Sequence, residues 1–442
     1  MRISLREYLR DVKIPANLRI NRQIKDYRKE CRKKGCKRPY HNFAFGQSPF
    51  SPPPKIVESL RKNAHKHDYV PTAGIPDLRD NISEYYKEIF GIDCDPERII
   101  VSPGSKMMIS MIAVVLEGPL IIPTPSWVSY LPQAMIARKE VIPVRLKPEE
   151  NFKLTPSRLE YLLKEHPADQ HNLILNNPNN PTGAVYSKQE LEELAVVLRK
   201  HNLVVISDEI YAQTAFDFDN FTSMGKVCPE RTIVTGGISK DRSAGGYRFG
   251  VGIFPNDNEL IKDVLKIAGS TYSSVPAPIE NACITAYSMD DDIQSYIHDC
   301  TRIHEAFGTR TSALLNEIPG IQATSPAGAF YLYVDFNSFD EQIRNIGFRT
   351  CAELCEHMIE VEHTALLPGE SLLLPENDFS VRLSYVDYNG DKVLSDWREE
   401  QPGTDREKAD VFERSCPSIQ QGIRNIERYF SQIKQGKKPE HM

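Results

Sequence analysis

Lys240 is the residue of this 442-residue chain that points most directly to chemistry. It follows the glycine pair Gly236-Gly237 closely, and Arg248 lies eight residues after it. An amine whose pKa is depressed attacks an aldehyde readily, and a nearby guanidinium both lowers that pKa and binds phosphate through two hydrogen bonds. The pair therefore predicts a site for an aldehyde cofactor that carries a phosphate. Taken without its neighbours, Lys240 is equally compatible with an ordinary solvated lysine.

Two polar segments upstream of Lys240 extend this site. The apolar runs 173–175 and 203–207 are typical of buried strands; Asn180 lies in the turn after the first run, and Asp208 and Tyr211 follow the second. A carboxylate at the end of a parallel strand can pair with a protonated pyridine nitrogen, which keeps the ring able to take up electrons. Asn180 and Tyr211 are placed to hydrogen-bond the ring oxygen. Together, these residues predict the chemistry of pyridoxal phosphate.

In this order, the segments resemble the class I/II aminotransferase family of fold-type-I pyridoxal-phosphate-dependent enzymes, which includes aspartate and aromatic aminotransferases. The resemblance runs from about Phe45 to about Phe430. It implies that Lys240 forms a Schiff base with the cofactor and shuttles the α-proton, and that Arg382 grips the α-carboxylate of the substrate. It assigns the catalytic chemistry to Lys240, Asp208 and Tyr211, and it places Arg248 at the cofactor, Asn180 at cofactor and substrate, and Gly46 at the substrate.

The residues that open the next helix complete the cofactor pocket. Gly104, Ser105 and Lys106 precede an apolar helix expected over 107–116, and the free N–H groups at its start are expected to cradle the phosphate. The family places an aromatic ring against the pyridine face, and Trp127 fits that position. An ordinary core tryptophan is the alternative interpretation.

The segment around Lys240 also departs from the family. Many members have a phosphate-binding serine three residues before the lysine, where this chain has Gly237. Ser239 could donate a hydroxyl to the phosphate instead, although a residue next to the lysine can equally point away. Arg242 stands where relatives often have apolar residues, and we interpret it as a solvated or interface residue.

Tyr69 predicts a homodimer. Its counterpart in the family reaches the phosphate across the dimer interface, so one chain alone would not complete its site.

Lys106 also bears on the substrate. Some bacterial-type aspartate and prephenate aminotransferases place a lysine there for the distal carboxylate, so we expect an L-amino acid such as aspartate or glutamate as donor. The expected acceptor is a 2-oxo acid such as 2-oxoglutarate. Lys106 could equally face the phosphate or solvent. Aromatic substrates stay open, because Phe45, Tyr69 and Trp127 could line a pocket that admits rings.

The same site residues support two alternatives to transamination. A pyridoxal-phosphate-dependent lyase would use them for β- or γ-elimination or related α-carbanion chemistry. A non-catalytic regulator of the same fold is less expected, because such proteins usually carry a fused DNA-binding domain and the segment before residue 40 is too short for one.

The fold class that must position these residues is α/β. Helical segments such as 188–201 alternate with buried strands, and each chemical motif follows a strand, where ligands bind in open parallel sheets. We expect a three-layer αβα large domain with a mostly parallel sheet over residues 70–305. A smaller α/β domain is expected over 306–442, and an N-terminal arm with part of that small domain over 1–69.

Outside the site, three segments carry structural expectations. The first forty residues hold fourteen Lys and Arg against four Asp and Glu, and we interpret them as a solvated arm packed on the partner subunit. Segment 388–417 is polar and turn-rich, and is expected to decorate the surface of the small domain. Helices are expected over 301–316 and about 418–434.

The composition agrees with a metabolic enzyme. A net charge of −6 and a pI near 6.1 give no reason to expect nucleic acid. No apolar run is long enough to span a membrane, so a soluble, cytoplasmic enzyme of amino-acid metabolism is expected. The nine cysteines include no Cys-x-x-Cys pair, which indicates neither a disulfide framework nor a metal site. Cys351 and Cys355 lie one helical turn apart and are expected to pack within a helix.

Overall fold

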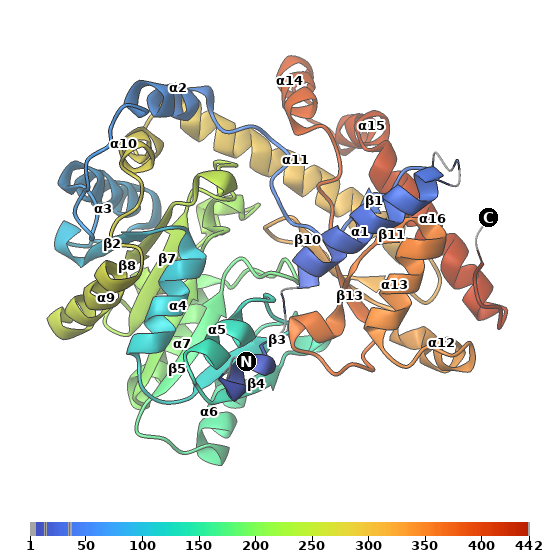
Figure 1. The fold of residues 1–442 in the computed structure, drawn as a ribbon, viewed down its shortest axis with the longest axis horizontal. Helices are drawn as coiled ribbons and strands as arrows, with labels where there is room; N and C mark the ends of the chain where they lie inside the picture. Colours follow the sequence, from blue (N-terminus) through green and yellow to red (C-terminus); the bar gives the residue numbers. More distant parts are fainter. Residues whose placement is uncertain (1–5, 13, 15, 34, 36–37, 441–442) are drawn as a thin grey trace, which may run out of the picture.

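The computed structural model describes residues 6–12, 14, 16–33, 35 and 38–440, and its largest element is a seven-stranded sheet (Figure 1). The strand order is β2-β8-β7-β6-β5-β3-β4. Strand β8 is antiparallel to both neighbours, and the other adjacent pairs are parallel, so the predicted mostly parallel sheet is confirmed. The strands are β2 (Ile99–Ser102), β3 (Leu120–Thr124), β4 (Val141–Arg145), β5 (His171–Asn176), β6 (Leu203–Asp208), β7 (Thr232–Gly237) and β8 (Gly250–Ile253).

Helices cover both faces of this sheet because its strands are apolar on both. On β6, Val205 belongs to the buried cluster that includes side chains of α6 (Pro156–Glu165) and α7 (Lys188–Lys200), whereas the next residue, Ile206, belongs to the cluster with α4 (Ser105–Val115) and α9 (Asn258–Thr271). Successive strand residues point to opposite faces, so each face needs its own layer of helices. The predicted three-layer αβα architecture is thereby confirmed. These helices are α4 (Ser105–Val115), α5 (Tyr130–Ile136), α6 (Pro156–Glu165), α7 (Lys188–Lys200), α8 (Met224–Val227) and α9 (Asn258–Thr271).

A smaller sheet carries Arg382. Its order is β12-β13-β10-β9, all antiparallel, and a separate parallel pair joins β1 to β11 with His41 opposite Thr364. The segment before the large sheet thus folds together with the segment after it. These strands are β1 (His41–Asn42), β9 (Gln322–Ala323), β10 (Tyr331–Asp335), β11 (Thr364–Ala365), β12 (Leu367–Pro368) and β13 (Ser380–Ser384), and the helices around them include α12 (Asp340–Asn345), α13 (Cys351–Glu362) and α16 (Pro417–Lys434).

Three further helices pack on one another beside strand β2 of the large sheet: α2 (Pro54–Asn63), α3 (Pro76–Phe90) and α10 (Ala277–Ala286). A fourth, α11 (Asp291–Asn316), runs from these helices to the smaller sheet (Figure 1). It begins ten residues before the helix expected at 301, because the carboxylate of Asp290 accepts hydrogen bonds from the first free N–H groups. The expected domain boundary at residue 305 falls inside this continuous helix, so the division into two domains stays a prediction.

The N-terminal arm packs on its own chain. Residues Glu7–Arg10 form a 3-10 turn, and α1 (Ala16–Lys33) buries Ile20 and Ile24 in a cluster that includes Leu367. Gln23 on α1 also donates to the Glu356 carboxylate of α13 over 2.9 Å. The expectation of a solvated arm is wrong for α1, because its apolar stripe packs on a surface of the same chain, whereas a contact of the arm with a partner subunit stays a prediction.

Segment 388–417 is largely helical, which corrects the turn-rich expectation. It forms α14 (Gly390–Glu400) and α15 (Asp405–Ser415), and a capping box between Thr404 and Glu407 starts the second helix. Phe412 on α15 is fully buried and meets the Phe307 ring of α11 with centroids 5.4 Å apart. Two buried apolar residues, Val411 and Phe412, thus anchor a helix whose other residues are mostly charged or polar.

The cysteines follow the sequence expectation except at one position. Cys351 and Cys355 are buried one turn apart on α13, with 4.0 Å between their Sγ atoms. Seven of the described cysteines have free thiols, whereas Cys31 is disulfide-bonded, which the sequence did not indicate. Within the described ranges, no helix has the length and apolar character of a membrane span, and no group of three metal-binding side chains gathers.

Candidate active site

The ends of three adjacent parallel strands converge on one cavity. Strands β5, β6 and β7 lie side by side, with Asn176 paired to Asp208 and Asp208 to Thr235, so the residues that follow them emerge at the same edge of the sheet. The cavity there has a volume of about 500 Å³. Of the predicted site residues, its wall includes Gly46, Ser105, Lys106, Trp127, Asn180, Asp208, Tyr211, Ser239, Lys240, Arg248 and Arg382.

Two predicted residues lie outside the cavity wall. Gly104 stands directly behind it, since a Cβ atom at this position would lie 2.2 Å from Nη2 of Arg248. Tyr69 is 92% exposed on the loop before α3 and takes no part in the cavity of its own chain.

Lys240 reaches the cavity from the turn after β7. Its Nζ donates to the carbonyl oxygen of Gly46 over 3.0 Å and lies 5.3 Å from the ring centroids of both Tyr211 and Phe330. No carboxylate among the described residues forms an ion pair with it. A half-buried amine held by one carbonyl and two ring faces is available to react with an aldehyde.

The glycine at position 237 is explained by the sheet. Gly237 pairs with Gly250 of β8, and a Cβ atom at residue 237 would lie 2.6 Å from the carbonyl oxygen of Phe249. A serine at this position would collide with backbone, so a phosphate-binding hydroxyl is sterically excluded at residue 237. Ser239 is half-buried and lines the cavity, which leaves it available for that contact.

Asp208 is buried at the end of β6 and accepts a hydrogen bond from a tyrosine hydroxyl. Burial raises the pKa of Asp208 to about 6, although the Tyr130 hydroxyl, the backbone N–H of Ile210 and the charge of Lys240 act to lower it. The Tyr130 hydroxyl donates to Oδ2 over 2.6 Å. A carboxylate with this pKa is mostly ionised at neutral pH and can hold a proton on a pyridine nitrogen.

Tyr130 was not among the residues that the sequence singled out. It opens α5, three residues after Trp127, and also packs edge-on against that indole with centroids 5.2 Å apart. Because Tyr130 follows Trp127 so closely in the chain, the sequence does suggest that it lies near the site. The sequence does not indicate its partner, since Asp208 lies 78 residues away.

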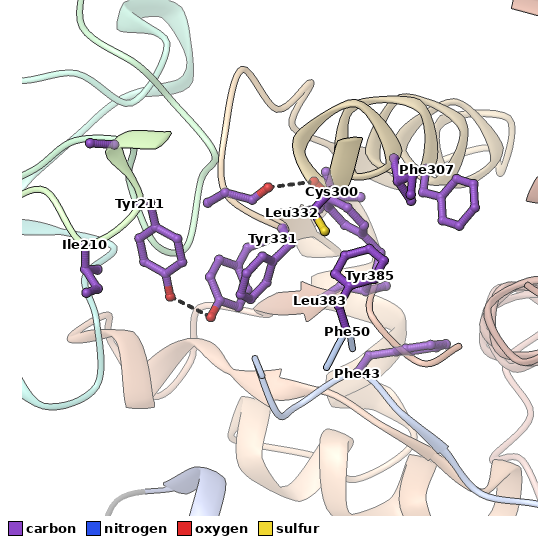
Figure 2. Close-up of a cluster of buried hydrophobic side chains, with 14 of the residues drawn as sticks. Phe43, Phe50, Ile210, Tyr211, Cys300, Phe307, Tyr331, Leu332, Leu383 and Tyr385 are labelled. Atoms are coloured by element: carbon purple, nitrogen blue, oxygen red, sulfur yellow. Dashed lines mark hydrogen bonds between the residues drawn. The ribbon is translucent and has the colours of Figure 1, made fainter. Parts of the chain in front are cut away.

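A second unforeseen tyrosine lies beside Tyr211. Figure 2 shows the hydroxyls of Tyr211 and Tyr331 facing each other at the edge of a buried apolar cluster, 2.8 Å apart. The Tyr331 hydroxyl also lies 3.3 Å from the carbonyl oxygen of Gly46, the same oxygen that accepts from Lys240. Burial, followed by the neighbouring Tyr331, raises the pKa of Tyr211 well above its usual value, so Tyr211 keeps its proton and can donate it in a hydrogen bond.

Arg382 brings a buried cation from β13 to the same cavity. It is 3% exposed, donates to the Ala44 carbonyl over 2.7 Å and to Oδ1 of Asn180 over 3.2 Å, and lies 4.6 Å above the Tyr331 ring. Among the described residues, its Nε has no hydrogen-bond partner and no carboxylate pairs with the guanidinium. Burial lowers the pKa of Arg382, the direction expected of a cation without a counter-ion. Such a site suits a substrate carboxylate.

The opposite wall is an anion site at the start of α4. Gly104 precedes the helix with φ 88°, and Ser105 and Lys106 form its first turn. Arg248, in the left-handed region with φ 58°, donates to the carbonyls of Pro103 and Gly245 and so stands beside the free N–H groups. Burial, then the charges of Arg248 and Lys240, lowers the pKa of Lys106. This concentration of positive charge at a helix N-terminus fits a phosphate.

Trp127 lines the cavity and also packs against the buried cluster behind it. It is half-buried, and Nζ of Lys106 lies 5.1 Å from its ring centroid. A flat aromatic face between the anion site and Asp208 matches the position in which a pyridine ring would stack.

Arg242 corrects the interpretation of a solvated residue. Its side chain is 1% exposed, pairs with Asp241 over 2.6 Å, and lies between the rings of Tyr85 and Tyr287. The sequence gives no periodic signal for such a contact, because the two tyrosines come from α3 and from the end of α10.

The chain resembles known aminotransferases over most of its length. The family model "Aminotransferase class I and II" matches residues 38–393. An aspartate aminotransferase of Bacillus subtilis is 30% identical over 352 residues, which cover 77% of this chain and 85% of that protein. The solved structure of Thermus thermophilus aspartate aminotransferase with maleate has a TM-score of 0.76 at 25% identity, covering 96% of this chain and all of that one. That of a Pyrococcus horikoshii aromatic aminotransferase has a TM-score of 0.74 at 26% identity, covering 89% and 96%.

These relatives are named as aminotransferases, which does not favour the lyase or the regulator as alternatives. The anion site, the buried carboxylate and the cavity lysine also fit the phosphate, the ring nitrogen and the aldehyde of one pyridoxal phosphate molecule. The chain therefore belongs to the class I and II aminotransferase family and is a pyridoxal-phosphate-dependent aminotransferase.

Proposed function

We propose that this aminotransferase takes its amino group from a dicarboxylic L-amino acid such as aspartate or glutamate and passes it to a 2-oxo acid such as 2-oxoglutarate. The observation that carries the proposal is a pair of cations, Arg382 and Lys106, on the wall of one cavity. Neither forms an ion pair with a described carboxylate. Arg382 suits the α-carboxylate, and Lys106 suits a distal one. The names of the Bacillus and Thermus relatives, and the dicarboxylate maleate in the latter structure, support this choice.

The residues that would hold the cofactor follow from the site. Ser105, Arg248 and the N-terminus of α4 would bind its phosphate, and Asp208 its ring nitrogen. Asn180 and Tyr211 would donate to the ring oxygen, and Trp127 would stack on the ring. Pyridoxal phosphate, when bound, supplies an aldehyde that takes up the amino group and a ring that withdraws electrons from the α-carbon.

Lys240 would do the proton chemistry. Its Nζ would hold the aldehyde of the cofactor in the absence of substrate, and the free amine would accept the α-proton of the substrate as a general base and later return it. Gly46 O offers the amine a hydrogen-bond partner at 3.0 Å, which keeps it at the cavity between these steps. Arg382 would hold the α-carboxylate and so restrict how the α-carbon can turn relative to Nζ.

Asp208 and Tyr130 would keep the ring nitrogen protonated. With a pKa of about 6 in the folded chain, the Asp208 carboxylate is ionised at pH 7, and the Tyr130 hydroxyl fixes Oδ2. The negative charge then stabilises a positive one on the ring.

An aromatic substrate is the second candidate. Phe45, Trp127 and Tyr331 line the cavity, and the Pyrococcus relative is an aromatic aminotransferase by name. A ring would be accommodated if Lys106 turned toward the phosphate.

A panel of L-amino acids added to the cofactor-loaded protein separates these candidates. We expect aspartate and glutamate to bleach the visible absorbance of the lysine-bound cofactor at lower concentrations than phenylalanine or tyrosine do. In Lys106→Met, the preference for dicarboxylates should be lost while aromatic substrates are unaffected. An unchanged preference in this variant would exclude Lys106 as the distal-carboxylate residue.

We further propose a homodimer in which Tyr69 completes the partner's phosphate site. Two observations support this: the family resemblance places a tyrosine at this position across the interface, and Tyr69 is 92% exposed in the single chain, which leaves it free to contact a second copy. The cytoplasmic location expected from the sequence stays a prediction.

A further inference from the structure

A buried ion pair follows Lys240 directly in the chain. Nη1 of Arg242 lies 2.6 Å from Oδ2 of Asp241, and the backbone N–H of Arg242 donates to Oδ1 over 2.7 Å. The two side chains are 1% and 8% exposed. Removing both charges from water costs folding free energy, and apolar residues of similar size often serve stability as well or better. Stability alone therefore gives no reason for this pair.

The guanidinium anchors the turn to the helix layer. Nε of Arg242 donates to the Ala286 carbonyl at the end of α10 over 2.8 Å. The guanidinium carbon lies 4.9 Å from the ring centroids of both Tyr85 and Tyr287. Tyr85 in turn donates to Gln213, just beyond the β6 end, over 2.7 Å. Arg242 thus joins the turn after β7 to α3, to α10 and, through Tyr85, to the segment after β6.

The turn needs such an anchor because its sequence supplies little stiffness. It ends in the pair Gly245-Gly246, and Gly246 would meet nothing within 4 Å even with a Cβ atom. Ser243 holds a left-handed conformation with φ 54°, and its hydroxyl bonds to those of Ser48 and Tyr296 over 2.6 and 2.7 Å. Lys240 lies at one end of this turn and Arg248 at the other.

We propose that Asp241 and Arg242 are positioning residues: their ion pair fixes the turn so that the Lys240 amine and the Arg248 guanidinium keep the separation that one cofactor molecule requires. The proposal rests on the roles assigned above to Lys240 and Arg248. A small displacement between two groups that hold the same ligand is costly, since misplacement by about 1 Å can reduce a rate about a hundredfold.

Arg242→Met tests the pair, because methionine keeps an apolar chain between the two tyrosines and removes the charge and the Nε donor. In the cofactor-free protein, amide hydrogen exchange over residues 238–248, read by mass spectrometry, is expected to become at least about tenfold faster. In the loaded protein, cofactor dissociation, followed by the visible absorbance, is expected to accelerate by a similar factor. Arg242→Lys retains the charge opposite Asp241 and should recover part of both.

Arg428→Met is the matched control. Arg428 pairs with Glu362 in the contact between α13 and α16, away from the cavity. The Glu362 side chain is 2% exposed and that of Arg428 is 30% exposed, and Arg38 also pairs with Glu362, so Arg428→Met removes one arginine from a partly buried ion pair. It should lower the unfolding temperature without changing exchange over 238–248 or cofactor dissociation. Normal exchange and dissociation in Arg242→Met, or equal changes in both variants, would overturn the proposal. A lysine-bound absorbance that persists in Lys240→Ala would instead refute the role of Lys240, and the exchange data would still decide the role of the pair.

Discussion

The Tyr130→Phe substitution tests the hydrogen bond that lowers the pKa of Asp208 and so favours its ionised form. The substitution removes one hydroxyl and keeps the ring that packs against Trp127 at 5.2 Å. A buried hydrogen bond to a charged group, such as this one of 2.6 Å, contributes about 1.5–3 kcal/mol. Since one pKa unit corresponds to about 1.4 kcal/mol, its loss should raise the pKa of Asp208 by about 1–2 units.

A higher pKa of Asp208 is expected to lower activity at neutral pH. The Asp208 pKa of about 6 means that roughly nine-tenths of the carboxylate is ionised at pH 7. After a rise of 1–2 units, only about a half to a tenth would be ionised at that pH. We therefore expect the acid limb of the pH profile of kcat/KM to move upward by about 1–2 units in Tyr130→Phe, with activity partly restored at higher pH.

The assay compares Tyr130→Phe with Tyr429→Phe over the same pH range. Tyr429 is also fully buried, and its hydroxyl lies 2.8 Å from Nδ1 of His357, between α16 and α13. The control should lose stability and keep the wild-type acid limb. An acid limb that does not move in Tyr130→Phe would show that the hydroxyl does not set the ionisation of Asp208, and the reasoning above would fail.

Four further predictions test other parts of the site. Lys240→Ala should lose both the visible absorbance of the lysine-bound cofactor and transamination, and retained turnover would contradict its role. Arg382→Lys should raise KM for the amino donor about 10- to 100-fold, because lysine cannot replace a two-point contact with a carboxylate; an unchanged KM would place that carboxylate elsewhere. Burial raises the pKa of Glu280 to about 7, so this carboxyl favours the folded state at low pH and that stabilisation is lost as the pH rises through 7. Chemical denaturation of the cofactor-free protein should therefore show that its unfolding free energy falls between about pH 5 and 8. In Glu280→Gln this fall should be smaller by up to about 3 kcal/mol. Parallel curves of unfolding free energy against pH for the two proteins would contradict this role of Glu280. Mixing Tyr69→Ala with Lys240→Ala under exchange conditions should give more activity than either alone, because a hybrid dimer has one site with both residues intact; no gain would argue against a shared site.

The sequence predicts best those features that depend on a local pattern of residues. The strands that deliver Asn180 and Asp208 are short apolar runs followed by polar turns, and the structure has them within two residues of the expected bounds. The pattern predicts that each site residue follows a strand, and the structure adds that β5, β6 and β7 are neighbours, which brings Asn180, Asp208 and Lys240 to one edge.

What the sequence does not predict depends on contacts between distant segments. Tyr130 meets Asp208 from another strand-end loop, and Tyr331 meets Tyr211 from the smaller sheet across 120 residues. A tyrosine carries no local sign of which partner its hydroxyl will find. Arg242 was interpreted as solvated for the same reason, since arginine is seldom buried and only the fold brings Tyr85 and Tyr287 around it.

The close approach of β8 to Gly237 constrains how this enzyme can evolve. A Cβ atom at residue 237 would meet the Phe249 carbonyl at 2.6 Å, so no larger residue fits here while β8 keeps its place. A substitution at residue 237 would therefore require a movement of β8. Variation in phosphate binding is more accessible at other residues of the cavity.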